Sequence, residues 1–166
     1  MSIEHRSIVA TRQAPLRDRY PDHPAEAIAV KRVRSLAGPS TDPLHGRVEP
    51  IGVDGTPWDF GLDAKVGGYD DLPNPGHLLC AALAACLDST LRMLADRLGI
   101  GLRRVQVDVV GHVDVRGCLA LADDVRPGFE RITCAVEMET APTADPRRTA
   151  IMRQQAERLC VTLDTL

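Results

Sequence analysis

Aromatic residues are scarce in this 166-residue chain, at 3% of the composition. A platform that stacks nucleobases needs several such rings, so their scarcity argues against a nucleic-acid-binding surface. An excess of one charge is lacking as well, since charged residues make up 26% and the formal net charge is -3. The composition therefore predicts neither nucleic acid nor an anionic membrane as a partner.

The sequence also shows no sign of a signal peptide or of a membrane-spanning helix. The start, Met-Ser-Ile-Glu-His-Arg, is too polar for a signal peptide. No apolar run reaches the roughly 18 residues that a membrane helix requires. The cysteines are odd in number and form no tight framework; they are Cys80, Cys86, Cys118, Cys134 and Cys160. Free or redox-active thiols in a reducing cytoplasm fit this usage best.

The strongest signal that is present is a long capped helix over residues 75–98. Asn74 is a good N-cap, and Pro75 suits the first helical position because its missing N–H would be unpaired there. Leucines recur every three or four residues up to Leu98, and Gly99 is placed to end the helix. This helix encloses Cys86 in an apolar run.

Shorter elements precede that helix. Residues 1–27 carry three prolines among many charges, which predicts an irregular or partly helical N-terminal arm ahead of a domain over 28–166. Strands are expected over 28–36, 46–53 and 58–66, with Asp54-Gly55 as the hairpin turn between the last two.

A strand hairpin and a second helix follow. Valines alternating with polar residues predict a strand over 104–116, and the alternation from Ile132 to Met138 predicts an antiparallel partner. Asp145-Pro146 repeats the cap-and-proline signal and opens a helix to about Cys160. This order predicts an α+β fold rather than a doubly wound one. Because the first helix is apolar nearly all round, a homodimer is expected to cover its second face.

The cysteines differ in what their positions predict. Cys134 is expected to pack in the core from its strand, and Cys118 to be an incidental surface thiol. Cys80 follows His77 by about one turn, but two ligands without a second pair favour packing over zinc. No metal site or cofactor is predicted from any other cluster.

Cys86 and Cys160 both lie on predicted helices beside apolar residues, so two buried thiols could meet. From the residues alone, packing is favoured over redox chemistry for this pair. Cys160 is near a helix C-terminus, where the dipole disfavours a thiolate, and Cys86 is too far inside its helix for dipole activation. A nucleophilic Cys86 would need a cation or a hydrogen-bond donor from elsewhere, while Cys160 suits a second thiol.

The run Asn74-Pro75-Gly76-His77-Leu78-Leu79-Cys80-Ala81-Ala82-Leu83-Ala84-Ala85-Cys86-Leu87 resembles the central-helix motif of the OsmC/Ohr family, the osmotically inducible protein C and organic hydroperoxide resistance proteins. Cys160 resembles that family's second cysteine. The resemblance implies an OsmC-like fold in which antiparallel sheet strands wrap two long helices in an intertwined homodimer.

The same resemblance implies an activity. In catalytic members the first cysteine attacks an organic hydroperoxide and becomes a sulfenic acid, and the second condenses with it to a disulfide that a small, typically lipoyl-type dithiol reduces. By motif position Cys86 would be the peroxidatic residue and Cys160 the resolving one. No cofactor is implied.

Two departures from the family pattern bear on activity. Catalytic members usually carry a glutamate after the Asn-Pro pair, where this chain has Gly76. They also use an arginine from the N-terminal part to stabilise the thiolate, for which Arg47 is the nearest candidate, ahead of Arg34 and Lys31. His77 and Leu83 are further candidates for a pocket near Cys86, although His77 is expected on roughly the opposite side of the helix.

Three functions remain open on these grounds. The first is a cysteine-based hydroperoxide reductase in oxidative-stress defence, favoured because both cysteines are retained together. The second is a non-peroxidase dimer of the same fold that binds a small apolar or electrophilic ligand, which Gly76 favours. The third is a structural protein in which all five cysteines pack or lie idle.

Overall fold

The computed structural model of the protein describes residues 6–38 and 41–166. The first five residues of the predicted arm, which include most of the polar start, and residues 39–40 of the predicted loop lie outside it. The chain divides into two compact units, and each is described by itself. The first unit comprises Met1–Ile28, Ala82–Val109 and Cys134–Leu166, and the second comprises Ala29–Ala81 and Val110–Thr133.

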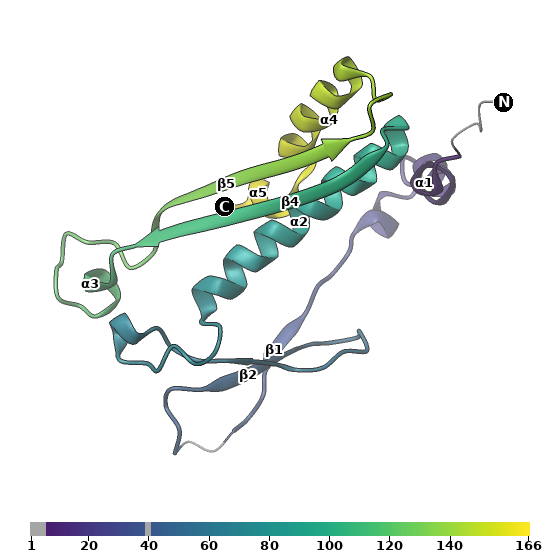
Figure 1. The fold of residues 1–166 in the computed structure, drawn as a ribbon. Helices are drawn as coiled ribbons and strands as arrows, with labels where there is room; N and C mark the ends of the chain where they lie inside the picture. The colour runs from purple at the N-terminus through teal and green to yellow at the C-terminus, as the bar shows by residue number, and fades with distance from the viewer. Residues whose placement is uncertain (1–5, 39–40) are drawn as a thin grey trace. The chain divides into compact units, whose positions relative to one another are not determined.

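Mixed helices and strands confirm the α+β class (Figure 1). In chain order they are α1 (Ile8–Arg19), η1 (Pro24–Ala27), β1 (Val33–Ser35), β2 (Gly46–Pro50), β3 (Trp58–Phe60), η2 (Ala64–Val66), α2 (Pro75–Leu98), β4 (Leu102–Val113), α3 (Val115–Cys118), β5 (Phe129–Thr140), α4 (Pro146–Leu159) and α5 (Val161–Thr165).

The long helix α2 begins and ends where the sequence predicts. The N–H of His77 donates to Asn74 Oδ1 at 3.0 Å, and the N–H of Asn74 donates back to His77 Nδ1 at 3.3 Å. This reciprocal pair satisfies two N-terminal donors, with histidine in the place that glutamate takes in a capping box. At the other end Gly99 adopts φ 65°, a left-handed conformation that glycine reaches without steric cost.

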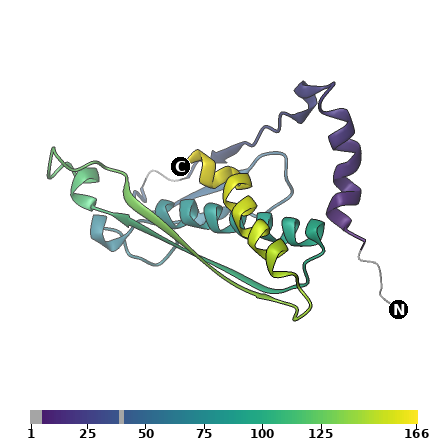
Figure 2. The ribbon, with the colours of Figure 1, turned by 90° about the horizontal axis from the view of Figure 1, so that it is seen from above.

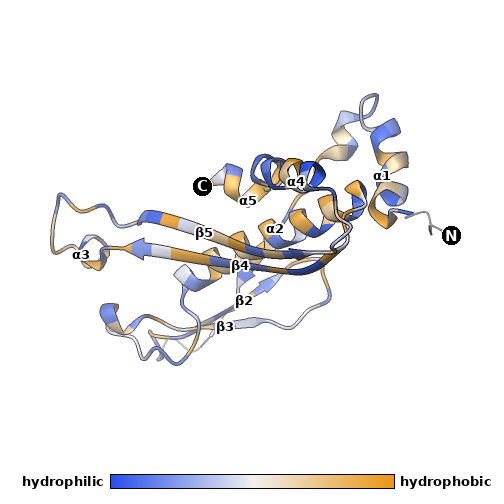
Figure 3. Ribbon diagram, turned by 45° about the horizontal axis from the view of Figure 1, so that its top comes forward, coloured by the Kyte–Doolittle hydropathy of each residue, from blue (hydrophilic) through white to orange (hydrophobic). Residues whose placement is uncertain are grey.

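The core of the first unit lies between α2 and α4. Among the described residues, the buried hydrophobic side chains are Leu83, Leu87, Leu91, Leu94, Ala95, Ile100, Met152, Ala156 and Cys160. Those on α2 recur at helical spacing, and Met152, Ala156 and Cys160 recur every four residues. Each set therefore forms one stripe, and the two stripes pack together. Figure 2 shows α4 lying across α2, and Figure 3 shows α4 alternating between hydrophobic and hydrophilic residues.

Strands β4 and β5 form a two-stranded sheet and run in opposite directions (Figure 1). Val105, Val107 and Val109 are half-buried on one face of β4, as the alternation predicts. The strand ends earlier than predicted, because Asp114 caps α3 by accepting the Arg116 N–H at 3.0 Å. Cys134 is exposed on β5 within this chain, so the prediction that it packs in the core is wrong.

In the second unit β2 pairs with both β1 and β3 in an antiparallel sheet of three strands. The predicted strands are present but shorter, and η2 replaces the end of the third. Asp54-Gly55 is not a two-residue hairpin turn, because seven residues connect Pro50 to Trp58. The left-handed glycine of this connection is Gly52, at φ 83°. The sequence pattern therefore predicted the position of the chain reversal between β2 and β3 correctly, but it predicted too short a connection.

The predicted arm is largely helical, since α1 and η1 cover much of it. Ser7 caps α1 by accepting the Ala10 N–H at 2.9 Å, and Pro15 lies inside the helix. The division into an arm over 1–27 and a domain over 28–166 stays a prediction.

By length and composition α2 could cross a membrane, so the expectation that no segment reaches that length needs correction. One such helix is weak evidence, since the core helix of a soluble protein passes the same test. A third of its apolar window is buried, and Leu83 and Leu91 within it are almost fully covered.

Replacing Met152 with Ala should destabilise the protein, because its side chain is fully buried between α2 and α4. Loss of a buried methionine side chain costs about 2–5 kcal/mol through lost transfer energy and a residual cavity. Urea unfolding at one fixed protein concentration measures the change. Arg153→Ala, the neighbouring exposed position, is the control and should change stability by less than about 0.5 kcal/mol; equal effects of the two variants would contradict the core described above.

Candidate active site

The candidate site brings together Cys86 of α2 and Cys160, the residue between α4 and α5. The two thiols are near enough that each shifts the pKa of the other. Cys86 is half-buried and Cys160 is fully buried, and both are free thiols. Both residues belong to the first unit, so the meeting of two thiols that the sequence left open is present in a single compact body.

Local structure fixes the position of each thiol. The carbonyl of Cys86 accepts hydrogen bonds from Ser89 Oγ at 2.9 Å and from Thr90 Oγ1 at 2.8 Å. The second bond explains why Thr90, the buried polar residue of this core, is stable there. Cys160 ends α4 with its N–H on the Ala156 carbonyl at 3.1 Å, and its own carbonyl accepts the Asp164 N–H of α5 at 3.0 Å.

The short helix α5, which the sequence analysis did not predict, supplies most of the donors that lower the pKa of Cys86. Burial by itself raises the pKa of the Cys86 thiol. Hydrogen bonds from the Thr162 hydroxyl, the Thr162 N–H, the Cys160 thiol and the Val161 N–H outweigh it and lower that pKa below its ordinary value. The donors that lower the pKa of Cys86 are therefore chiefly the first residues after Cys160.

The pKa of Cys160 is shifted in the opposite direction, above its ordinary value. Burial raises the pKa of its thiol, a hydrogen bond from the Leu163 N–H opposes this, and the neighbouring Cys86 raises it further. One thiol of the pair is thus prepared to ionise while its partner is held protonated. This asymmetry suits a nucleophile beside a second thiol that reacts later.

The remaining predicted site residues have other surroundings. Leu83 is 1% exposed and belongs to the core of α2 and α4. His77 is exposed and completes the N-terminal cap of α2 through Nδ1. Arg47 lies on β2 opposite Asp59 of β3, and its Nε contacts Asp59 Oδ1 at 2.6 Å. The structure thus gives Arg47 a carboxylate partner within the second unit. Arg34 pairs likewise with Glu49 at 2.6 Å.

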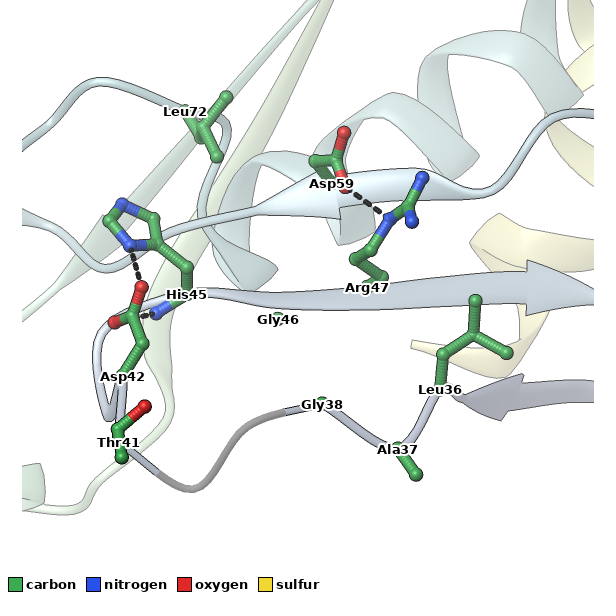
Figure 4. Close-up of a pocket in the computed structure, with 10 residues that line it drawn as sticks. All are labelled: Leu36, Ala37, Gly38, Thr41, Asp42, His45, Gly46, Arg47, Asp59 and Leu72. Atoms are coloured by element: carbon green, nitrogen blue, oxygen red, sulfur yellow. Dashed lines mark hydrogen bonds and ion pairs between the residues drawn. The ribbon is translucent and has the colours of Figure 1, made fainter.

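Arg47 and Asp59 line a pocket of about 500 Å³ in the second unit, which Figure 4 shows. At its other side His45 Nδ1 lies 2.9 Å from Asp42 Oδ2, and His45 Nε2 lies 3.1 Å from Asp71. The Tyr69 ring stacks on the imidazole with centroids 5.9 Å apart. Gly46 of β2 pairs with Phe60 of β3, and the Phe60 ring covers Gly46. The two strands can approach this closely because Gly46 has no side chain.

The two carboxylates that hold His45 shift its titration. Hydrogen bonds to Asp42 and then Asp71 raise the pKa of His45 above its ordinary 6.5, and the bond to His45 lowers the pKa of Asp42 below 3.8. The raised histidine contributes stability that is present below pH 6.5 and is lost as the pH rises through its folded pKa. The depressed Asp42 contributes stability above pH 3.8 that is lost as the pH falls through its folded pKa. The cluster is therefore most stabilising between these limits.

A sequence model of the OsmC-like protein family matches residues 68–166, which is more than half of the chain. The protein belongs to the OsmC-like family. Among the curated proteins none matches the chain. The family match covers α2, both thiols and the β4–β5 sheet, and so supports the resemblance on which Cys86 and Cys160 were selected.

Solved structures show the same fold. An OsmC-like protein of unknown function from Vibrio cholerae has a TM-score of 0.68 at 11% identity, covering 84% of this chain and 94% of its own. An OsmC-like protein from Mycoplasma pneumoniae has a TM-score of 0.63 at 12% identity, covering 82% and 86%. The organic hydroperoxide resistance protein OsmC of Legionella pneumophila has a TM-score of 0.57 at 19% identity, covering 83% and 89%. At identities of 11% to 19%, these structures show that the fold is shared and show nothing further about this chain.

Thr162→Val should raise the pKa of Cys86, because it removes the hydroxyl that stabilises the thiolate. A hydrogen bond to a charged group is worth about 1.5–3 kcal/mol, so alkylation of Cys86 at pH 7 should slow by about tenfold. The rate is followed by iodoacetamide labelling and peptide mass spectrometry over a pH series.

Two variants control that experiment. Thr162→Ser keeps the hydroxyl and should retain the rate, whereas Thr165→Val removes a hydroxyl of α5 that instead bonds the Val161 carbonyl at 2.8 Å. An equal loss of rate in Thr165→Val would mean that helix stability, and not the Thr162 hydroxyl, activates Cys86.

Asp71→Asn should lower the pKa of His45 towards 6.5, since the variant loses the carboxylate at Nε2. NMR titration of the imidazole signals measures this, with His45→Gln assigning the His45 signal. Asp70→Asn is the matched control, because that carboxylate accepts the Ala64 N–H and does not contact His45. An unchanged His45 titration in Asp71→Asn would show that Asp71 does not hold the ring in solution.

Proposed function

We propose that this OsmC-like protein is a thiol-dependent hydroperoxide reductase with Cys86 as the peroxidatic residue and Cys160 as the resolving residue. The observation that carries the proposal is that α2 and the end of α4 bring Cys86 and Cys160 together, with the pKa of Cys86 lowered and the pKa of Cys160 raised. Donors from Val161 and Thr162 stabilise the Cys86 thiolate, a form that cysteines serving only to pack the core do not adopt.

The proposed reaction has two steps. The Cys86 thiolate attacks the terminal oxygen of ROOH, the O–O bond breaks, and the leaving alkoxide takes a proton to give ROH and a Cys86 sulfenic acid. The Cys160 sulfur then attacks the sulfenic sulfur, forming the Cys86–Cys160 disulfide and releasing water. The sum consumes one hydroperoxide and two thiols and yields ROH, water and one disulfide.

We expect an organic hydroperoxide to react faster than hydrogen peroxide. Cys86 lies on α2 between the buried Leu83 and Leu87, and Met152 and Ala156 lie on α4 ahead of Cys160, so the surroundings of the pair are apolar. Neighbouring folds include proteins whose names state organic hydroperoxide resistance, from Legionella pneumophila and Elizabethkingia anophelis.

Reduction of the disulfide completes the proposed cycle. A small dithiol of lipoyl type exchanges with the Cys86–Cys160 disulfide, becomes oxidised itself and returns both thiols. We place the protein in the cytoplasm as a homodimer, in keeping with its free cysteines and with the apolar helix α2. Arg47 remains a candidate for the activating cation. In that role its guanidinium would leave Asp59 and pair with the Cys86 thiolate instead.

A second candidate function, ligand binding without peroxide chemistry, is favoured by the position of Gly76. A Cβ there would lie 3.1 Å from Asn74 Oδ1 and 3.3 Å from the Phe129 ring. A side chain at this position would therefore require Asn74 and the Phe129 ring to shift by a few tenths of an ångström, so the local packing is tight around glycine. A dimer of this kind would bind a small apolar or electrophilic molecule near Cys86 and leave the thiols unoxidised.

One equivalent of cumene hydroperoxide should convert the protein to a Cys86–Cys160 disulfide, with a loss of two hydrogens in intact mass and a crosslinked peptide. Hydrogen peroxide in parallel should react more slowly. Cys160→Ser should stop at the sulfenic acid, trapped by dimedone on Cys86, because no resolving thiol is left. Cys86→Ser should abolish the fast reaction.

Cys118→Ser is the matched control, since that thiol is exposed and bonds only the Val115 carbonyl at 3.2 Å. It should react like the parent protein. Intact thiols after the hydroperoxide, or oxidation spread over Cys118 and Cys134, would reject the reductase and direct the search to ligands of a non-catalytic dimer.

A further inference from the structure

A second pocket lies in the first unit where α1, the C-terminal part of α2 and α4 meet. Its volume is about 540 Å³. Leu94, its nearest α2 residue to the thiols in sequence, is eight positions past Cys86, or about 12 Å along the helix axis at 1.5 Å per residue. Neither Cys86 nor Cys160 lines the pocket, although Leu159 of its lining directly precedes Cys160 in the chain.

Helix α1 is held in place as one side of this pocket. Ser7 Oγ donates to Asp96 Oδ2 at 2.6 Å, and the Val9 N–H donates to the same oxygen at 2.8 Å. One turn further along α1, Gln13 Nε2 donates to Met93 Sδ at 3.2 Å. These bonds join the helix to α2 although α1 has no buried residue of its own.

The polar groups of the pocket are two guanidiniums, Arg17 and Arg97, and two carboxamides, Gln13 and Gln155. None of its described lining residues is acidic. Neither arginine has an ion-pair partner within residues 6–38 and 41–166. The lining of the pocket thus carries two guanidiniums that form no ion pair with a described carboxylate.

The remaining lining is apolar. Leu94 and Leu98 contribute from α2, and Ile151 and Leu159 contribute from α4. Ile151 is 49% exposed and Leu159 is 44% exposed, so this surface still gains from being covered. A fitting ligand therefore combines an anionic head with an apolar body.

We propose that this pocket binds an amphiphilic monocarboxylate of the medium-chain fatty-acid type. The carboxylate would lie between Arg17 and Arg97, whose planar forks match its two oxygens, and the carboxamides would donate to the remaining lone pairs. The hydrocarbon chain would cover Leu98, Ile151 and Leu159. This site stands independently of the thiol chemistry, so its test does not depend on peroxide turnover.

Calorimetric titration of the full-length protein with monomeric decanoate tests the proposal. We expect saturable binding of one decanoate per chain. Decanol, which lacks the carboxylate, and acetate, which lacks the hydrocarbon chain, should each bind at least about tenfold more weakly. Arg17→Gln and Arg97→Gln should each weaken decanoate binding by about tenfold or more, because each removes a charge-assisted hydrogen bond.

Arg12→Gln on α1 and Arg153→Gln on α4 are the matched controls, since both arginines are exposed and neither lines the pocket. They should leave the affinity unchanged. Ile151→Trp, at a half-exposed position, should block the pocket without changing its charge, and circular dichroism verifies that each variant is folded. Absence of decanoate binding, equal affinity for decanol, or unchanged binding in the Arg17→Gln, Arg97→Gln double variant would overturn the proposal.

Discussion

The packing of α4 across α2 (Figure 2) is the contact on which the rest of this structure depends. Met152 and Ala156 seat α4 on the leucine stripe of α2, and the same four-residue spacing carries Cys160 into the core. Because α4 ends at that residue, the chain turns into α5 beside Cys86 and its first N–H groups face the thiol. Core packing and thiol activation are thus produced by one interaction.

Local hydrogen-bond donors lower the pKa of Cys86 in this arrangement. A thiolate inside a helix gains nothing from its own helix dipole, and burial opposes its ionisation. Here the hydroxyl and N–H of Thr162 and the N–H of Val161 supply the compensation at short range and without a buried counter-charge. Such activation survives at high salt, where exposed ion pairs weaken, and it depends instead on α5 staying folded.

Paired and unpaired basic side chains are suited to different roles in this chain. In the second unit, carboxylates partner the basic side chains of the strand pocket, as in the pairs of Arg47 with Asp59 and of His45 with Asp42 and Asp71. In the first unit, Arg17 and Arg97 face apolar residues and carboxamides without such partners. Satisfied pairs stabilise a local structure, whereas uncompensated guanidiniums beside apolar surface are suited to binding an anion from solution.

The sequence by itself determined the elements whose signals are local. The caps at Asn74 and Asp145, the stop at Gly99 and the leucine spacing define α2 and α4, and the motif around Cys86 identified the family. Local patterns could not show that the Asp54-Gly55 connection is longer than a tight turn, that Cys134 is exposed, or that five residues after Cys160 form a helix. Only tertiary structure decided these points and the donors to Cys86, because hydrogen bonds between residues 76 positions apart depend on how α4 packs on α2 and leave no periodic trace in the chain.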